Sequence, residues 1–316
     1  MAEWICNVAF SNESDHGALV LGTSSLGARG VDEAALETAG ALIGSGLRID
    51  TSNAYADGRS ERVLGLALAT LESAERDAAA SRVITKVDRD PDTGVFDASR
   101  VRRSCEESLG RLGVDHVSLL HLHDPYTVTV DEAFGPGGAV EGLLQLKQER
   151  IVGAIGIAAG PVPLVRRYVD SGAFDAVLCH NRFTLVDRSA SDLFAAAKDL
   201  GMTVFNAAPF GGDLLVRGPR PDARYAYRPI EDALWQWTAE FFRVCASHGI
   251  SPAAAALRVS TTSPLVDHTV VGVSSPQRIS ELLAAHSENI PDALWSAIDA
   301  LGPVPSPIDD TEYEGT

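Results

Sequence analysis

The sequence lacks the features that mark several large classes of protein. It has no apolar run near the roughly 18 residues that a membrane-spanning helix needs. Its first ten residues, MAEWICNVAF, carry an acidic residue where a signal peptide would carry positive charge. Positive charge is scarce throughout, with 26 Lys and Arg against 43 Asp and Glu and a formal net charge of −17. Nucleic acids and anionic membranes bind basic surfaces, so we expect neither as a partner. The sequence therefore predicts a cytoplasmic protein, and it does not specify an oligomeric state.

Cysteine is also sparse, and its spacing excludes two kinds of scaffold. The four cysteines are far apart and form no C-x-x-C pair: Cys6, Cys105, Cys179 and Cys245. Disulfide frameworks and zinc sites both draw on closely grouped cysteines. We therefore expect reduced, buried thiols.

The chain does contain a regular alternation of short apolar runs and longer amphipathic segments. Near-continuous apolar runs are typical of parallel strands that are buried on both faces. About eight βα units is the number that closes a (β/α)8 TIM barrel, so we predict a single α/β domain over residues 1–316. The expected strands are 18–22, 47–50, 83–87, 117–123, 152–157, 175–180, 203–208 and 268–273. The expected helices are 31–46, one from Ser60, 98–113 (with Ser99 as cap and Gly113 as stop), 139–149, 162–171, 189–200, 232–248 and one from Pro276.

An open doubly wound sheet is the competing architecture. It would place a G-x-G-x-x-G motif directly after the first strand. The sequence has GTSSLGARG at 22–30 instead, which lacks that spacing. The barrel is therefore the preferred fold, with a long loop after the seventh strand and a C-terminal helix.

Two segments show little periodicity. Residues 217–231, after the seventh expected strand, are rich in proline and arginine. A loop this long either folds over a functional site or is a surface excursion. Residues from about 303 to 316 are acidic and contain prolines, so we expect a loosely ordered tail.

Four residues lie at or just after the ends of three successive expected strands: Asp50, Tyr55, Lys86 and His123. In a TIM barrel, the active site lies at this end of the strands. A phenol is a weak acid with a pKa of about 10, and a nearby ammonium makes it a stronger one, so we expect Tyr55 to be partly a phenolate. A carboxylate can hold the ammonium, and an imidazole can orient the substrate oxygen. The pattern predicts proton transfer at a substrate oxygen, although each residue taken alone also fits a turn, a rim or a solvated strand end.

His121 and His123 raise a second interpretation. They are two residues apart on one strand and so point to the same face. An H-x-H pair also begins the metal site of some hydrolases, but such a site needs further ligands from other strand ends. No other residue has ligand spacing, so we expect no metal, and we expect His121 to be packed inside the barrel.

The four residues and a series of other segments together resemble the aldo-keto reductase superfamily. The resemblance covers nearly the whole chain. FDAVLCHNRFTLVD (174–187) and RYAYRPIEDAL (224–234) look most like the bacterial aldose dehydrogenases that include L-fucose (D-threo-aldose) and pyridoxal dehydrogenases. The other segments are GTSSLG (22–27), SERVLGLAL (60–68), the HDP after the fourth strand, IVGAIGI (151–157), NRFTLVDR (181–188), AAPFGGDLL (207–215) and VVGVSSPQRISELL (270–283).

This resemblance implies an NAD(P)-dependent oxidoreductase with Asp50, Tyr55, Lys86 and His123 as catalytic residues. The expected reaction is oxidation of an aldose to its lactone, or of an aromatic alcohol or hemiacetal such as pyridoxal. An NADPH-dependent aldehyde or ketone reductase is one alternative. A cofactor-bound regulatory or binding barrel with little turnover is another.

The resemblance also implies which residues bind the cofactor. In relatives, a lysine for the 2′-phosphate of NADP often stands where this chain has Gly272, so we expect NAD to be slightly favoured over NADP. The chain also departs from its relatives at Ala158–Ala159, His180 and Ala207, where contacts to the nicotinamide are expected. The implied cofactor-binding residues are Gly22, Thr23, Asn181, Pro209, Phe210, Gly211, Leu214, Gly272, Ser274, Ser275, Gln277, Arg278 and Glu281.

Overall fold

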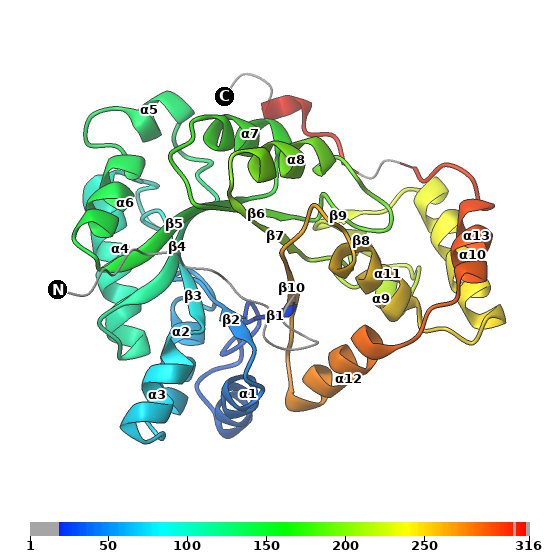
Figure 1. Ribbon diagram of the computed structural model, residues 1–316, viewed down its shortest axis with the longest axis horizontal. Helices are drawn as coiled ribbons and strands as arrows, with labels where there is room; N and C mark the ends of the chain where they lie inside the picture. The colour runs from blue at the N-terminus through cyan, green and yellow to red at the C-terminus, as the bar shows by residue number, and fades with distance from the viewer. Residues whose placement is uncertain (1–18, 306–307, 314–316) are drawn as a thin grey trace.

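Parallel strands form a closed barrel at the centre of the protein (Figure 1). The computed structural model describes residues 19–305 and 308–313. Strands adjacent in the barrel are successive in the chain, and the last one closes the barrel by pairing with the first, Leu19 opposite Thr269. The strands are β1 (Leu19–Gly22), β2 (Arg48–Asp50), β3 (Val83–Val87), β4 (Val117–His123), β5 (Val152–Ala159), β6 (Ala176–His180), β7 (Thr203–Ala207) and β10 (His268–Gly272). The predicted TIM barrel is confirmed, and each strand ends within two residues of its expected end.

The strands are apolar because both of their faces are covered. Side chains alternate between the barrel interior and the layer of helices. Val20, Ile84 and Phe205 belong to the cluster inside the barrel. Leu19, Leu21 and Val83 belong to the larger cluster between the strands and the helices.

Helices surround the barrel, as the amphipathic segments predicted (Figure 1). Those on the expected segments are α1 (Glu33–Gly44), α2 (Arg59–Leu68), α4 (Ala98–Leu112), α6 (Ala139–Gln148), α7 (Val162–Asp170), α8 (Ser191–Asp199), α10 (Asp232–Ser247), α12 (Pro276–Ser287) and the C-terminal α13 (Asp292–Asp299), which packs on α10. The sequence analysis missed α3 (Ser73–Ala80), α5 (Val130–Phe134), α9 (Leu214–Arg217) and α11 (Pro252–Thr261).

The predicted cap of α4 is wrong by two residues. Asp97, not Ser99, accepts the hydrogen bond from the backbone N–H of Arg100, at 2.8 Å. The Ser99 hydroxyl donates to the same carboxylate and so has no capping role. The predicted stop is confirmed, since Gly113 ends the helix with a φ of 70°, a conformation that glycine adopts without strain.

The segment 217–231 is an ordered excursion at the C-terminal end of the strands. It contains a small hairpin of β8 (Arg224–Tyr225) and β9 (Arg228–Pro229). The two connecting residues, Ala226 and Tyr227, both have positive φ, as a two-residue hairpin turn requires. The Tyr225 hydroxyl donates a hydrogen bond to the Asn181 carbonyl at 3.0 Å and lies 2.8 Å from the Thr184 hydroxyl. These contacts hold the hairpin against the loop after β6.

Part of the segment that we expected to be loosely ordered makes defined contacts. Asp310 accepts two hydrogen bonds from the buried Arg182 guanidinium, at 2.6 and 3.0 Å, and a third from the backbone N–H of Val162. Residues 308–313 are thereby tied to the loops after β5 and β6, so the expectation of loose order does not describe them.

Cys105, Cys179 and Cys245 are buried and unpaired, in keeping with the expected reduced thiols. Cys6 lies outside the described residues.

Candidate active site

A cleft opens at the C-terminal ends of the strands, and the four predicted catalytic residues all line it. Asp50 ends β2, Lys86 lies near the end of β3 and His123 ends β4. Tyr55 lies on the loop that follows β2. Parallel strands of a closed barrel end at one rim, so four residues spread over 74 positions of sequence meet at one place.

Lys86 is the centre of this group. Its side chain is 1% exposed, and its Nζ donates to Asp50 Oδ2 at 2.6 Å, to the Thr51 carbonyl at 2.7 Å and to Tyr55 Oη at 3.2 Å. Burial by itself would lower the pKa of Lys86, but the Asp50 carboxylate and the Tyr55 oxygen outweigh it and raise that pKa above its usual value. Lys86 is therefore an ammonium at neutral pH, and it is held against the phenol.

Tyr55 corrects one expectation from the sequence. Burial is the largest influence on this group and raises the pKa of Tyr55 to about 12. The Lys86 charge acts in the opposite direction, as expected, but it does not overcome burial. Tyr55 is consequently a phenol at neutral pH and not partly a phenolate. It is ready to donate a proton, and it becomes a base only as the pH rises.

His123 is fixed by a carboxylate that the sequence analysis missed. The ring lies edge-on to Tyr55, with centroids 5.7 Å apart. Its Nδ1 is 2.7 Å from Asp88 Oδ1, which leaves Nε2 for the cleft. Asp88 itself accepts hydrogen bonds from the Ser52 hydroxyl at 2.6 Å and from the Ala54 N–H at 3.0 Å. Burial lowers the pKa of His123, but the Asp88 charge outweighs it, so that the net shift is upward.

Asp88 follows Lys86 by two residues, so strand alternation alone would have placed both side chains on the same side. That signal was available in the sequence.

We expect Asp88→Asn to shift the pH dependence of reduction. Because Asp88 raises the pKa of His123, the protonated imidazole persists to a higher pH than in an ordinary histidine. Removing the charge lowers that pKa, so the decline in kcat/KM assigned to His123 should move to lower pH. A pH–rate profile measures this shift.

The matched control is Asp88→Glu, which keeps the charge and should leave the decline closer to its wild-type position. If Asp88→Asn has a wild-type profile at all pH values, then Asp88 does not act on the protonation of His123.

His121 is packed inside the barrel, as expected. It is fully buried, its ring centroid is 5.8 Å from that of Phe205, and within the described part of the chain neither ring nitrogen has a hydrogen-bond partner. Burial holds the pKa of His121 well below its usual value. Across residues 19–305 and 308–313, no group of three or more His, Cys, Asp or Glu is placed to hold a metal ion.

A second polar pair lines the cleft beside the four residues, and the sequence analysis did not assign it to the site. Asp124 lies directly after β4, and His180 ends β6. Asp124 Oδ2 is 3.8 Å from His123 Nε2, and Asp124 Oδ1 is 3.7 Å from His180 Nε2. Burial raises the pKa of Asp124, but His180 and His123 outweigh it and bring the value to about 2.

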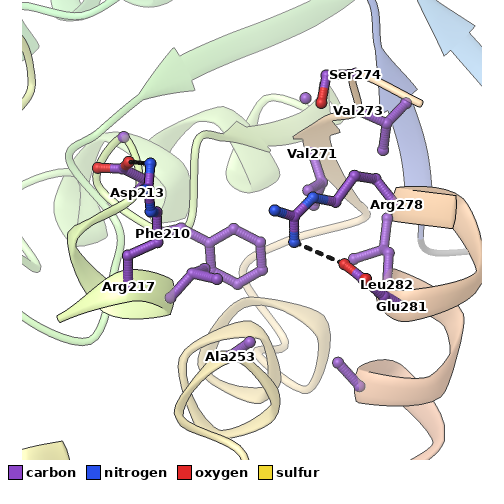
Figure 2. A pocket seen from close by; sticks show the side chains of 14 residues that line it. Phe210, Asp213, Arg217, Ala253, Val271, Val273, Ser274, Arg278, Glu281 and Leu282 are labelled. Carbon is purple, nitrogen blue, oxygen red and sulfur yellow. Dashed lines mark hydrogen bonds and ion pairs between the residues drawn. The ribbon is translucent and has the colours of Figure 1, made fainter.

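A cavity continues from the cleft toward the start of α12, and Phe210, Gly212, Val271 and Gly272 line both spaces. In Figure 2 the Arg278 side chain extends from α12 toward Phe210, and its guanidinium pairs with Glu281 at 2.6 Å. Predicted cofactor-binding residues that line the cleft or this cavity are Gly22, Thr23, Pro209, Phe210, Gly272, Ser274, Arg278 and Glu281.

The remaining predicted residues do not line these two spaces, and each has another contact. Gly211 packs on the buried Tyr225, where an added Cβ would lie 2.2 Å from the ring. Leu214 is in the core beneath α9. Gln277 donates to Glu281. Ser275 caps α12 by accepting from the N–H of Arg278. Asn181 is 2% exposed and lies directly behind the cleft wall, with its Nδ2 3.1 Å from Nδ1 of His180, which lines the cleft.

The two connected spaces fit a nicotinamide adenine dinucleotide. The buried Oδ1 of Asn181 has no hydrogen-bond partner within the described residues, and a carboxamide N–H is the kind of group that satisfies such an oxygen. α12 begins beside the cavity, which Ser274 and Arg278 line, and helix starts favour phosphate. Gly272 is exposed, and an added Cβ there would meet nothing closer than Ser24 Oγ at 3.8 Å.

A closed parallel barrel with a buried Asp–Lys–Tyr group at its C-terminal rim, in a cleft that continues into a second cavity at the start of α12, is the architecture of a barrel oxidoreductase. The sequence profile of the Aldo/keto reductase family matches residues 18–303, so the chain belongs to this family.

Several characterised relatives are dehydrogenases. The chain is 30% identical to a D-threo-aldose 1-dehydrogenase of Pseudomonas sp., over 67% of this chain and 64% of the relative. It is 30% identical to an L-galactose dehydrogenase of Arabidopsis thaliana, over 76% and 73%. It is 27% identical to a pyridoxal 4-dehydrogenase of Microbacterium luteolum, over 66% and 64%. The match thus spans slightly less than two thirds of the first and third of these relatives.

Solved structures agree on the fold. An aldo-keto reductase from Bacillus halodurans, in its holo form, superposes with a TM-score of 0.71 at 21% identity, over 92% of this chain and 93% of that one. An aldo/keto reductase from Klebsiella pneumoniae, in complex with NADP and acetate, gives 0.65 at 22%, over 93% and 94%. Within the described residues, no helix is long and apolar enough to cross a membrane.

Proposed function

We propose that this protein is an NAD(P)-dependent oxidoreductase that interconverts a small polar alcohol or hemiacetal and the corresponding carbonyl compound. The observation that carries the proposal is the contact between Tyr55 Oη and the buried Lys86 ammonium, 3.2 Å apart, in the cleft that adjoins the cavity at the start of α12. When bound, a nicotinamide nucleotide supplies or accepts the hydride. Asn181 would contact its carboxamide, and the start of α12 would contact its phosphates.

The side chains of the site move and hold the proton. In reduction, Tyr55 donates its phenolic proton to the substrate oxygen, and His123 Nε2 orients that oxygen. In oxidation, Tyr55 takes the hydroxyl proton, which requires the phenolate. Because burial raises the pKa of Tyr55 to about 12, we expect oxidation to accelerate as the pH rises above neutral. Lys86 stabilises the phenolate that forms, and Asp50 holds Lys86.

The proposed substrate is an aldose oxidised at its anomeric carbon to a lactone, or a hemiacetal such as that of pyridoxal. The names of the relatives support this choice, as does the cleft. Beside Tyr55 and His123, its wall carries the polar side chains of Asp124 and His180 and the hydroxyl-bearing ring of Tyr227. Such groups can hydrogen-bond the hydroxyls of a sugar, and the apolar remainder of the wall can pack against its carbons.

The near-ultraviolet absorbance of reduced nicotinamide tests the proposal. Purified protein is mixed with NAD or NADP and a panel of aldoses, pyridoxal and simple aromatic alcohols. We expect reduced cofactor to accumulate with at least one aldose or with pyridoxal. If it accumulates only in the opposite direction, with simple aldehydes and NADPH, the protein is a general carbonyl reductase. If no change occurs in either direction although the cofactor binds, the protein is a binding barrel with little turnover.

We further propose that NAD serves at least as well as NADP. The cavity that would hold the adenosine contains two carboxylates, Asp213 and Glu281, each paired with an arginine. A carboxylate can accept a hydrogen bond from the ribose 2′-hydroxyl of NAD and repels the 2′-phosphate of NADP. Arg217 and Arg278 are partly neutralised by these partners, and Gly272 adds no cation.

We expect Gly272→Lys to improve the use of NADP. The position is exposed, has room for a side chain and lines the cavity, so an added ammonium can form a charge-assisted hydrogen bond with the phosphate. The use of NAD should barely change. The measurement is kcat/KM for both cofactors, with Gly272→Met as a control of similar length and no charge. If the wild type prefers NADP by more than about tenfold, or about 1.4 kcal/mol, then Arg217 or Arg278 binds the phosphate and the NAD preference is wrong.

A further inference from the structure

We infer that Asp124 and His180 form a binding subsite for a hydroxyl group on the carbon next to the reacting carbon. The subsite would select α-hydroxy carbonyl compounds and the hemiacetals of sugars. The inference rests on the proposed function, and it names the feature of the substrate that this cleft recognises.

The first observation is a gap of suitable size between two complementary groups. Asp124 Oδ1 and His180 Nε2 are 3.7 Å apart, which is too long for a hydrogen bond. Asp124 Oδ1 has no hydrogen-bond partner within the described residues, although it is buried. One hydroxyl oxygen can lie within hydrogen-bonding distance of both groups. It would donate to the carboxylate and accept from the imidazole.

The second observation concerns the proton on His180. The side-chain amide of Asn181 lies with its Nδ2 3.1 Å from His180 Nδ1. An amide N–H donates, so Nδ1 is the acceptor and the ring proton of neutral His180 is on Nε2. With the Asn181 amide in this orientation, the nitrogen that faces Asp124 is a donor in either protonation state of the ring. The pair offers one acceptor and one donor, which a hydroxyl satisfies and a carbonyl or ether oxygen does not.

The third observation is that the backbone holds this pair in place at a conformational cost. Asp124 and Asn181 have φ values of 43° and 60°, in the left-handed region that side chains other than glycine rarely adopt. The N–H of Asp124 donates to the Ala158 carbonyl at 2.9 Å, and that of Asn181 to the Ala207 carbonyl at 3.1 Å. Neighbouring strands thus fix both residues. Strain of this kind is concentrated at functional sites.

The charge of Asp124 narrows the chemistry of the ligand. Its pKa of about 2 keeps it a carboxylate at any working pH, so it can only accept hydrogen bonds. It would repel a phosphate or carboxylate at the same position. The subsite therefore favours neutral polyols over sugar phosphates and sugar acids.

The two oxygens of the Asp124 carboxyl group indicate which substrate hydroxyl the subsite binds. Asp124 Oδ2 is 3.8 Å from His123 Nε2, the nitrogen that orients the reacting oxygen, while Oδ1 faces His180. Two substrate oxygens bound along one carboxyl group are carried by neighbouring carbons. In a cyclic aldose, the anomeric carbon has two neighbours, the ring oxygen and C2. The ring oxygen cannot donate to a carboxylate, so the group bound at Asp124 is the C2 hydroxyl.

The test compares an aldose with its 2-deoxy analogue in two proteins, wild type and Asp124→Asn. We expect wild type to prefer the aldose by at least about tenfold in kcat/KM, since a site built for a hydroxyl discriminates against its absence. Asp124→Asn should lower kcat/KM for the aldose and change it little for the 2-deoxy sugar. This cycle isolates the contact with the hydroxyl from any effect of Asp124 on His123, because the second effect alters both substrates alike.

Two results would overturn the subsite: equal use of both sugars by wild type, or an equal loss with both sugars in Asp124→Asn. The failure of the proposed function looks different, since neither sugar is then oxidised. In that case, reduction of glycolaldehyde is compared with reduction of acetaldehyde. These two aldehydes also differ by one hydroxyl on the carbon next to the reacting carbon. If these also fail to react, calorimetric binding of the aldose and its 2-deoxy analogue to both proteins decides the subsite. Weaker binding of the aldose to Asp124→Asn, with 2-deoxy binding unchanged, supports it, and equal binding contradicts it.

Discussion

Turnover in both directions should fall by at least about 10²-fold in Tyr55→Phe, the lower end of the range for loss of a positioned acid–base group. The substitution keeps the ring that packs edge-on to His123 and removes only the oxygen that Lys86 contacts. No other hydroxyl lies within 3.5 Å of Lys86 Nζ among the described residues, so no neighbour replaces it. The measurement is kcat with the best substrate from the panel, at several pH values.

Two controls show whether the loss of turnover comes from the missing acid–base group. Cofactor affinity, measured by quenching of protein fluorescence, should barely change, because Tyr55 does not line the cavity at the start of α12. The rise of oxidation with pH should also disappear, since its source is ionisation of Tyr55. Near-normal turnover in the variant would remove Tyr55 from the mechanism.

Lys86→Met should give the second largest effect. The change keeps the length of the side chain and deletes both influences of Lys86 that lower the pKa of Tyr55, its charge and its hydrogen bond. With burial unopposed, the pKa of Tyr55 rises further above its ordinary value. The increase of oxidation with pH should then move to still higher pH, and the rate at mildly alkaline pH should fall by about tenfold for each unit of this shift. A pH–rate profile for oxidation measures it.

Lys86→Met needs a second variant as a control for stability, because it leaves Asp50 as a buried carboxylate without its cation. Asp50 and Lys86 are both almost fully buried, and removing one member of such a pair can cost about 3–5 kcal/mol of folding stability. The double variant Asp50→Asn/Lys86→Met removes both charges and should recover much of the melting temperature without recovering the pH profile. A wild-type profile in a folded double variant would show that Lys86 does not act on Tyr55.

The architecture could be derived largely from local sequence. The strands were found because parallel strands covered on both faces need continuous apolar residues, as in VITKV at β3. Helices with strong apolar periodicity were found for a similar reason. The missed α3 and α5 are too short to show such periodicity. α5 does begin with a capping box between Thr129 and Glu132, but helices this short depend on packing in the folded chain.

That the proposed catalytic residues lie together could also be predicted from the sequence. Asp50, Lys86 and His123 lie at strand ends, and the barrel then brings every strand end to the same rim. Tyr55 lies on a loop, so strand ends alone did not predict it. The resemblance to aldo-keto reductases assigned it to the group. The sequence therefore determined the fold, the residue types of the site and the family.

The tertiary structure decided the electrostatics and the details of the cleft. Whether Tyr55 is a phenol or a phenolate depends on the balance between burial and the Lys86 charge, and burial is a property of the folded chain. The contact between Asp88 and His123, the pairing of Arg278 with Glu281 and the gap between Asp124 and His180 join residues from separate loops or helices, at distances that no sequence spacing determines. Fold is encoded by repeated local patterns, whereas charge, pKa and ligand shape arise from distances of a few ångströms between distant parts of the chain.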